Sequence, residues 1–180
     1  MRGVEELTGA TRFQPPEEGR SLGVEWVADV LVRGYAKAGG SLGGEACRAV
    51  PVDGGGGRRL SLGFAIESEA QRSGEHSESG QGHYWEYDLG RNALAISRQA
   101  KLFFDCASVR LAGLGRPVPV RAVVDVSDGL DGDQPALREA NLAVVHSASL
   151  AMARELGCED HGNLPDRLLV RQRTVRTIAP

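Results

Sequence analysis

The sequence predicts a two-layer α+β domain in which an antiparallel sheet is covered by two helices. Three observations lead to this fold class. Several segments between residues 46 and 126 alternate apolar and polar residues, which is the pattern of half-buried strands. Short turns separate these segments, so neighbouring strands should pair antiparallel. One amphipathic helical segment precedes the strands and a longer one follows them.

The length of 180 residues suits one domain. We expect residues 1–20 to form a flexible arm, because Pro15, Pro16 and Gly19 interrupt a segment without apolar periodicity. Residues 21–180 should form the domain. The net charge of −3 argues against binding to nucleic acid or to an anionic membrane, since both need a basic surface. No run approaches the ~20 apolar residues of a transmembrane segment.

The first helix should begin after Ser21, a residue type that caps helices, and end before Gly39. Apolar residues recur at helical spacing between them, with Trp26 as the expected anchor in the core. Strands are expected at residues 46–52 and 59–67, joined by glycines at 54–57. A strand follows these glycines, whereas a phosphate-binding loop needs a helix N-terminus there. The glycines are therefore interpreted as a hairpin turn.

Residues 69–82 contain no aliphatic residue larger than Ala70 and are rich in Ser, Gly, Glu and Gln. Such a segment buries little apolar surface, so we expect a mobile surface loop. Alternation resumes at residues 83–89, 93–98, 101–111 and 118–126. The second and third of these segments are interpreted as further strand, which a bulge near Gln99 could join into one long strand.

The long helix should follow Asp133 or Gln134 as its cap, with Pro135 in its first turn and Gly157 at its end. Asn141 and His146 lie on or beside its apolar face, and a structural hydrogen bond is the role expected for each. Residues 168–178 alternate weakly and are predicted to form a last edge strand, in which arginines discourage aggregation.

Cysteine positions bear on the compartment of the protein. Cys106 ends an apolar strand segment and Cys158 follows the glycine that ends the long helix. A strand end and a helix end are suitable anchors for a disulfide, and a Cys106–Cys158 disulfide would indicate an extracytoplasmic domain. The alternative is a cytoplasmic protein with three buried thiols, including Cys47. Because residues 1–20 lack the apolar core of a signal peptide, the extracytoplasmic interpretation implies a trimmed or mis-started ectodomain.

Carboxylates are dense between the last central strand and the long helix, and such a loop could hold a divalent metal ion. The candidate ligands are Asp125, Asp128, Asp131 and Asp133. The spacing is not that of an EF-hand, and acids before a helix equally suit turn formation and the helix dipole. The string Asp-Val-Ser-Asp-Gly-Leu at 125–130 resembles a segment of the thiamine-monophosphate kinase family of ATP-using enzymes. Beyond this loop, the sequence predicts no catalytic residue and no cofactor.

The C-terminal half resembles uncharacterised secreted or lipid-anchored proteins of high-GC Gram-positive bacteria. The similarity lies in Phe-Phe-Asp-Cys at 103–106, Leu-Pro at 164–165, and Arg-Glu-Ala-Asn-Leu-Ala-Val-Val-His-Ser-Ala-Ser-Leu-Ala-Met-Ala-Arg-Glu-Leu-Gly-Cys at 138–158. It implies an extracytoplasmic location, with one cysteine before a hairpin and one after the helix, and it implies no activity.

Two function classes follow from the sequence. The first is a non-catalytic extracytoplasmic domain that is structural or binds a protein, an envelope component or a small molecule. Binding would use the sheet face or the loop at 69–82. The second is a metal-dependent enzyme that uses the loop at 125–133.

Overall fold

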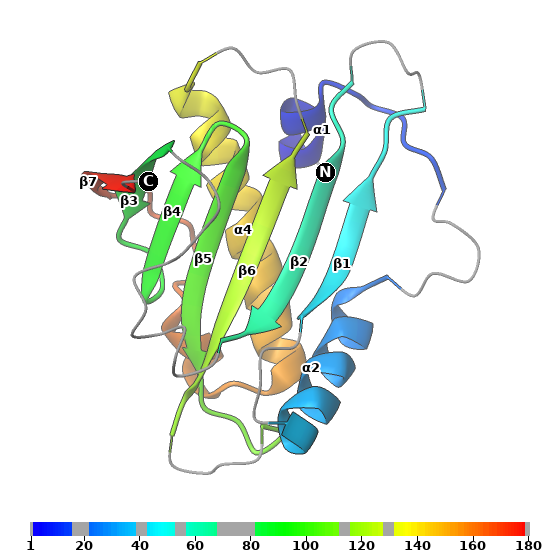
Figure 1. Ribbon diagram of the computed structural model, residues 1–180, viewed down its shortest axis with the longest axis vertical. Coiled ribbons are helices and arrows are strands. Elements are labelled where there is room, and N and C mark those ends of the chain that lie inside the picture. The colour runs from blue at the N-terminus through cyan, green and yellow to red at the C-terminus, as the bar shows by residue number, and fades with distance from the viewer. Residues whose placement is uncertain are drawn as a thin grey trace.

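The computed structural model describes residues 2–15, 22–38, 43–52, 57–67, 82–111, 116–127 and 132–178. Within these residues, seven strands form one antiparallel sheet, and the helices pack into a single core on one of its faces (Figure 1). The predicted two-layer α+β class is confirmed.

The strands are β1 (Gly43–Ala49), β2 (Leu60–Ile66), β3 (Gly82–Tyr87), β4 (Asn92–Ile96), β5 (Gln99–Cys106), β6 (Val118–Val126) and β7 (Gln172–Ile178). Their order across the sheet is β1-β2-β6-β5-β4-β3-β7. Strands β3 to β6 form a meander, to which the β1–β2 pair adds on one side. Strand β7 pairs with β3 at the other edge of the sheet. The last strand therefore occupies an edge position, as predicted. The predicted loop at 69–82 lies, except for Gly82, outside the described residues.

The helices are α1 (Arg2–Thr8), α2 (Val24–Ala38), α4 (Pro135–Leu156) and the short 3-10 helix η1 (Glu159–Asn163). Helix α1 corrects the expectation of a flexible arm for residues 2–8. It packs on α4, and Leu7 and Thr8 are fully buried. Arg58 holds the end of α1 in place, because its Nε donates to the carbonyl of Leu7 over 2.7 Å and its backbone N–H donates to the carbonyl of Thr8 over 2.9 Å.

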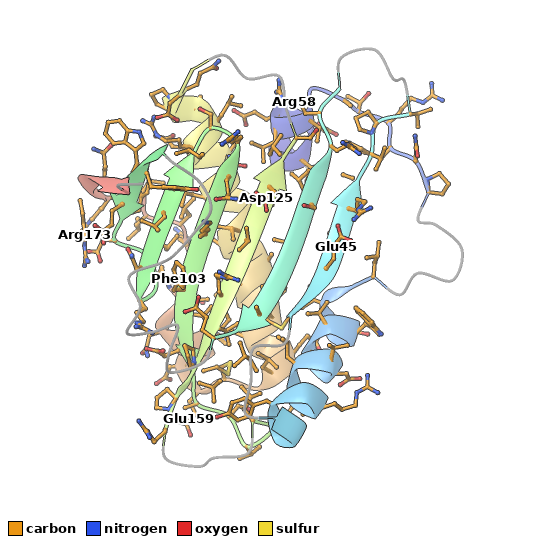
Figure 2. The ribbon with its side chains drawn as sticks, in the orientation of Figure 1. Glu45, Arg58, Phe103, Asp125, Glu159 and Arg173 are labelled. Carbon is orange, nitrogen blue, oxygen red and sulfur yellow. A yellow bond between two sulfur atoms is a disulfide. The ribbon has the colours of Figure 1, made fainter. Side chains whose placement is uncertain are left out.

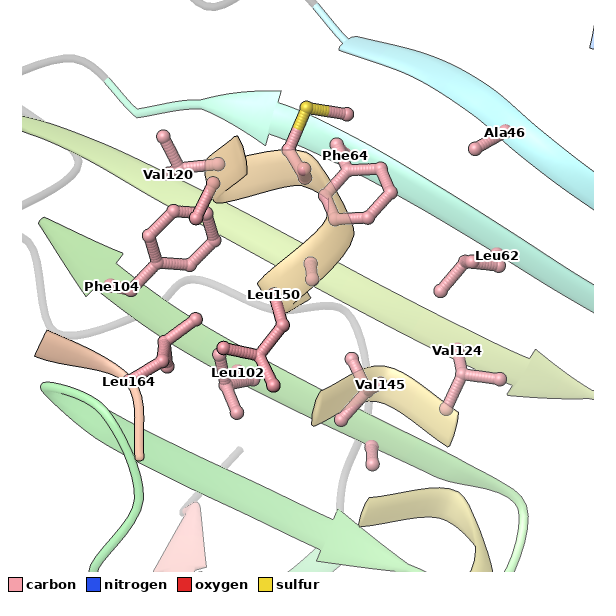
Figure 3. Packing of buried hydrophobic residues seen from close by; sticks show 14 of the residues in the cluster. Ala46, Leu62, Phe64, Leu102, Phe104, Val120, Val124, Val145, Leu150 and Leu164 are labelled. Atoms are coloured by element: carbon pink, nitrogen blue, oxygen red, sulfur yellow. The ribbon is translucent and has the colours of Figure 1, made fainter. Parts of the chain in front are cut away.

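The core lies between α4 and the central strands, where alternate side chains of β2, β5 and β6 point toward the helix (Figure 3). Each of these side chains is at most 8 % exposed, and burial of one large apolar side chain contributes roughly 1.5–3 kcal/mol. The strands supply Leu62, Phe64, Leu102, Phe104, Val120 and Val124, and α4 supplies Val145 and Leu150, which are equally buried.

Helix α4 begins and ends at the residues that the sequence predicts. Pro135 is its first residue, and Gly157 ends it with φ of 68°, donating its N–H to the carbonyls of Ala153 and Arg154. Asn141 and His146 make the expected structural contacts. The Nδ2 of Asn141 donates to the carbonyls of residues 96 and 97 over 3.1 and 2.9 Å, and Nε2 of His146 lies 2.8 Å from the carbonyl oxygen of residue 165.

Two local expectations differ from the structure. Residues 93–111 do not form one bulged strand, because the chain reverses at Ser97 and Arg98 and β4 pairs with β5. This turn lacks Gly, Pro and Asn, and Ser97 is its only residue of a type common in turns, so its sequence signal is weak. Trp26 is 40 % exposed and does not anchor α2, whereas Val27 and Leu31, which are one helical turn apart, are fully buried.

The Cys106–Cys158 disulfide is present and joins the end of β5 to the residue after Gly157, with the two Cα atoms 4.9 Å apart. Both cysteines are buried, whereas Cys47 on the edge strand β1 is exposed. The chain then turns through residues 160–163 with φ between 46° and 68°. Gly162 is required in this turn, because a Cβ atom there would lie 2.7 Å from a ring carbon of Phe104.

We predict that loss of the disulfide lowers the stability of the fold strongly. The bridge spans 52 residues of sequence, so its chain-entropy effect is about 4 kcal/mol. That is a large share of the ~5–15 kcal/mol typical of a domain. Thermal unfolding of the Cys106→Ala/Cys158→Ala variant should show a markedly lower melting temperature, and Cys47→Ser should leave it near wild type. Titration of the denatured, unreduced protein should find one thiol; three thiols would contradict the bridge.

Candidate functional site

The candidate metal ligands are only partly covered by the structure. Asp128 and Asp131 lie outside the described residues, Asp125 lies in β6 and Asp133 lies just before α4. Asp125 stands between two buried valines of β6 that face the helices, so its own side chain points to the opposite face of the sheet. Asp133 lies on the helix side. Among the described residues, no group of three or more His, Cys, Asp or Glu side chains is placed to hold a metal ion.

Asp133 is the centre of a hydrogen-bond network that fixes the start of α4. Its Oδ1 accepts from the backbone N and the Oγ of Ser97 over 3.0 and 2.9 Å, and its Oδ2 accepts from Nε1 of Trp85 over 2.5 Å. Arg138 also donates to Oδ2. The guanidinium of Arg138, which is 6 % exposed, lies 4.3 Å from the centre of the Trp85 ring and donates to the hydroxyl of Tyr87 over 3.2 Å. The carboxylate of Asp133 therefore has a structural role.

A different feature appears on the face of the sheet that no described helix covers. This open face, which points toward the viewer in Figure 2 with α4 behind it, carries Glu45, Phe103 and Asp125. A hollow of about 700 Å³ lies on it over β1, β2, β6 and β5. This volume is within the ~300–1,000 Å³ of typical ligand pockets. We call it the sheet-face hollow, and the side chains most relevant to its chemistry are Ser61, Tyr84, Gln99, Lys101, Arg121 and Asp125.

The hollow exists because small residues of β2 alternate with large ones that point into the core. Gly63 and Ala65 face the hollow, while Leu62 and Phe64 are buried under the helices. Gly63 lies opposite Val123 of β6 in the sheet register. The long side chains that border the hollow come from β5 and β6, and they rise beside the small residues of β2 that form its floor.

Lys101 is unusual among the residues that line the hollow, because it is a lysine and yet only 5 % exposed. Its Nζ lies 5.0 Å from the centre of the Tyr84 ring, where the ring face attracts a cation. Burial, followed by the neighbouring charge of Arg121, lowers the pKa of Lys101 to about 8, and Asp125 acts in the opposite direction. Lys101 pairs with Val123 and Arg121 with Phe103, so the two cations are diagonal neighbours on adjacent strands.

A chain of hydrogen bonds crosses the hollow beside Lys101. The hydroxyl of Tyr84 donates to Oε1 of Gln99 over 2.9 Å, and Nε2 of Gln99 donates to Oδ1 of Asp125. Burial raises the pKa of the Tyr84 hydroxyl, which keeps it a hydrogen-bond donor at neutral pH. Side chains from β3, β5 and β6 are thereby held in fixed positions.

Sequence reasoning found Asp125 but missed the rest of this site. Lys101 carried a usable signal, because the chain has only two lysines and this one lies in an apolar strand segment. The alignment of Gly63, Lys101 and Asp125 depends on the pairing of β2, β6 and β5, which brings together residues about 60 positions apart.

Comparisons with protein-family models, with curated proteins and with solved structures give no match to this chain. Within the described part of the chain, none of the helices combines the length and the apolar character needed to cross a membrane. The sheet-face hollow is therefore the feature of the described residues that bears on function.

We predict that Asp133→Asn lowers the free energy of unfolding by about 3 kcal/mol, because it leaves the buried Arg138 guanidinium without its carboxylate. Asp88→Asn is the matched control, since Asp88 pairs with Arg173 over 2.6 Å and both side chains are about half exposed. Its loss should be below ~1 kcal/mol. Urea unfolding measures both values, and equal losses would contradict the structural role of Asp133.

We also predict that stability rises with pH between about 8 and ~10.4. The folded-state pKa of Lys101 is about 8. Its unfolded value is ~10.4, so the unfolded state binds more protons between these pH values. Below about pH 8 both states are protonated and the unfavourable effect is constant. Lys101→Met should be more stable at pH 7 and should lack this rise in urea unfolding. A slope identical to that of wild type would contradict the buried position of Lys101.

Proposed function

We propose that this protein is a non-catalytic extracytoplasmic domain that binds a small molecule in the sheet-face hollow. The observation that carries the proposal is the hollow itself, a space of about 700 Å³ on a sheet face without a described helix. A concave site with a few fixed polar groups is the usual form of a small-molecule site. Lys101, Gln99 and Asp125 supply such groups.

The extracytoplasmic part of the proposal is supported by the disulfide. Cys106 and Cys158 are joined in the core-side layer, and disulfides persist mainly in oxidising compartments. Cytoplasmic reductants would keep these thiols reduced, at a loss of stability to the end of α4. The resemblance of the C-terminal half to secreted proteins points to the same compartment.

The metal-dependent alternative receives no support from the described residues. Of its four proposed ligands, Asp133 is bound within the Ser97, Trp85 and Arg138 network. Asp125 points to the other face of the sheet, where it accepts a hydrogen bond from Gln99. A single cation would need both carboxylates within ~2.6 Å.

The proposal is tested by filling the hollow. Ala65→Phe places a large side chain over the floor, and Val109→Phe is the control, because Val109 is 78 % exposed at a distant turn. Ligand-observed NMR against a mixed library of polar small molecules should find binders to wild type and to Val109→Phe that no longer bind Ala65→Phe. Thermal unfolding verifies that both variants fold. Binding that survives in folded Ala65→Phe would overturn the proposed site.

A further inference from the structure

We propose that Lys101 is a nucleophile that captures a small polar aldehyde in the sheet-face hollow by forming an imine with it. The proposal rests on the proposed function, because it names the ligand class and the mode of binding at the same site. Three features of the structure support it. These are the position of Lys101 in the hollow, the burial of its side chain and the second cation beside it.

Lys101 lies in a row of residues that crosses the hollow. In the sheet register it lies opposite Val123 of β6, which lies opposite Gly63 of β2, and Gly63 lies opposite Glu45 of the edge strand β1. All four residues line the hollow. Directly opposite residues on adjacent strands have their Cβ atoms ~5 Å apart, so the space over Val123 and Gly63 is next to Lys101. A small molecule held there lies within reach of the lysine side chain.

Two physical effects activate the amine of Lys101. The residue is 5 % exposed, and Arg121 is its diagonal neighbour on β6. Burial, followed by the charge of Arg121, lowers the pKa of Lys101 to about 8, and Asp125 acts in the opposite direction. Among the described residues that line the hollow, Glu45 and Tyr84 are the other titratable ones. A desolvated lysine beside a second cation is an arrangement that activates lysines for Schiff-base formation with carbonyl compounds. This activation needs burial and proximity, and it does not require either cation to lack other partners.

The lowered pKa matters because only the neutral amine can attack a carbonyl group. An amine with a pKa of about 8 is neutral in roughly one-tenth of the molecules at pH 7. An ordinary lysine, with a pKa of ~10.4, is neutral in roughly four molecules of ten thousand at the same pH. Lys101 therefore presents about two hundred times more of the reactive form than an ordinary lysine does.

The covalent step is balanced by the amine and the aldehyde alone. The lone pair of Nζ adds to the carbonyl carbon, and a C–N bond forms. The carbonyl oxygen leaves as water with the two protons of the neutral amine, which gives the imine. When the imine takes up a proton, its positive charge lies near the ring face of Tyr84, whose centre is 5.0 Å from Nζ of Lys101. Hydrolysis reverses the step, so the ligand is held without turnover.

The next row of the hollow favours an aldehyde that carries hydroxyl groups. Ser61, Asp125 and Gln99 lie opposite one another on β2, β6 and β5. Their hydroxyl, carboxylate and amide groups are of the types that exchange hydrogen bonds with ligand hydroxyl groups. Gln99 is two residues from Lys101 on the same strand, which places the two rows ~7 Å apart. A hydroxyaldehyde of about three carbons, with one hydrogen bond of ~2.8 Å, spans this distance.

Reductive trapping tests the proposal. The probe is glyceraldehyde, and sodium cyanoborohydride converts any imine into a stable secondary amine. Mass spectrometry of the tryptic peptides then measures the label separately at Lys101, at the N-terminal amine and at Lys37, which is the only other lysine and lies in α2 on the other face of the sheet. At pH 7, Lys101 should be labelled about tenfold or more faster than Lys37. Its rate should rise with pH and level off above about pH 8.

Two variants and a second probe complete the experiment. Lys101→Arg keeps the positive charge and removes the amine, so the label on its peptide should be lost, whereas Lys37→Arg is the matched control and should keep the label at Lys101. Thermal unfolding verifies that both variants fold. Propanal has the same number of carbons as glyceraldehyde and no hydroxyl groups. It should label Lys101 several times more slowly, relative to Lys37, than glyceraldehyde does.

The inference would be overturned by labelling of Lys101 in folded wild type that is no faster than that of Lys37 at pH 7. A rate at Lys101 that still rises above pH 10, or a propanal rate equal to that of glyceraldehyde, would also contradict it. Each of these results leaves the hollow as a binding site if Ala65→Phe abolishes binding of the library compounds. Library binding that survives in folded Ala65→Phe would overturn the proposed function itself.

Discussion

The packing of α4 against β5 and β6 is the interaction on which the rest of the structure depends. The helix is fixed at both ends by different chemistry. At its start, Asp133 binds Arg138 and the turn between β4 and β5, and at its end, Cys158 is joined to Cys106 of β5. Because both ends are held, the long helix covers one face of the sheet along its length, and large apolar side chains of the central strands point to that face.

This arrangement also determines which side chains lie on the opposite face of the sheet. A strand alternates its side chains, so the residues between the core positions of β2, β5 and β6 face away from α4. On β2 they are small, at Ser61, Gly63 and Ala65, and on β5 and β6 they include the long or charged side chains of Gln99, Lys101, Arg121 and Asp125. The difference in size produces the hollow. Lys101 lies there with its pKa lowered to about 8, chiefly by burial.

Much of the fold could be predicted from sequence, because alternation and helix-end residues are local signals. Pro135 and Gly157 located α4, and the alternation of residues 60–66 located β2. Helix α1 could not be predicted, since it places essentially one apolar residue, Leu7, in the core. The site was largely missed for a different reason. Its residues come from four strands and meet only through sheet register, while Asp125 and Asp133, which are eight positions apart in sequence, lie on opposite faces of the sheet.

The central claim is that a small molecule binds in the hollow on the open face of the sheet. Backbone amide chemical-shift mapping in ¹⁵N-labelled protein, with a compound that binds wild type in the library screen as the added ligand, tests it most directly. The predicted result is a saturable set of shifts centred on Gly63, Lys101 and Val123, with the amides of α4 unchanged. Shifts centred on α4, or no saturable shifts with any compound of the library, would contradict it.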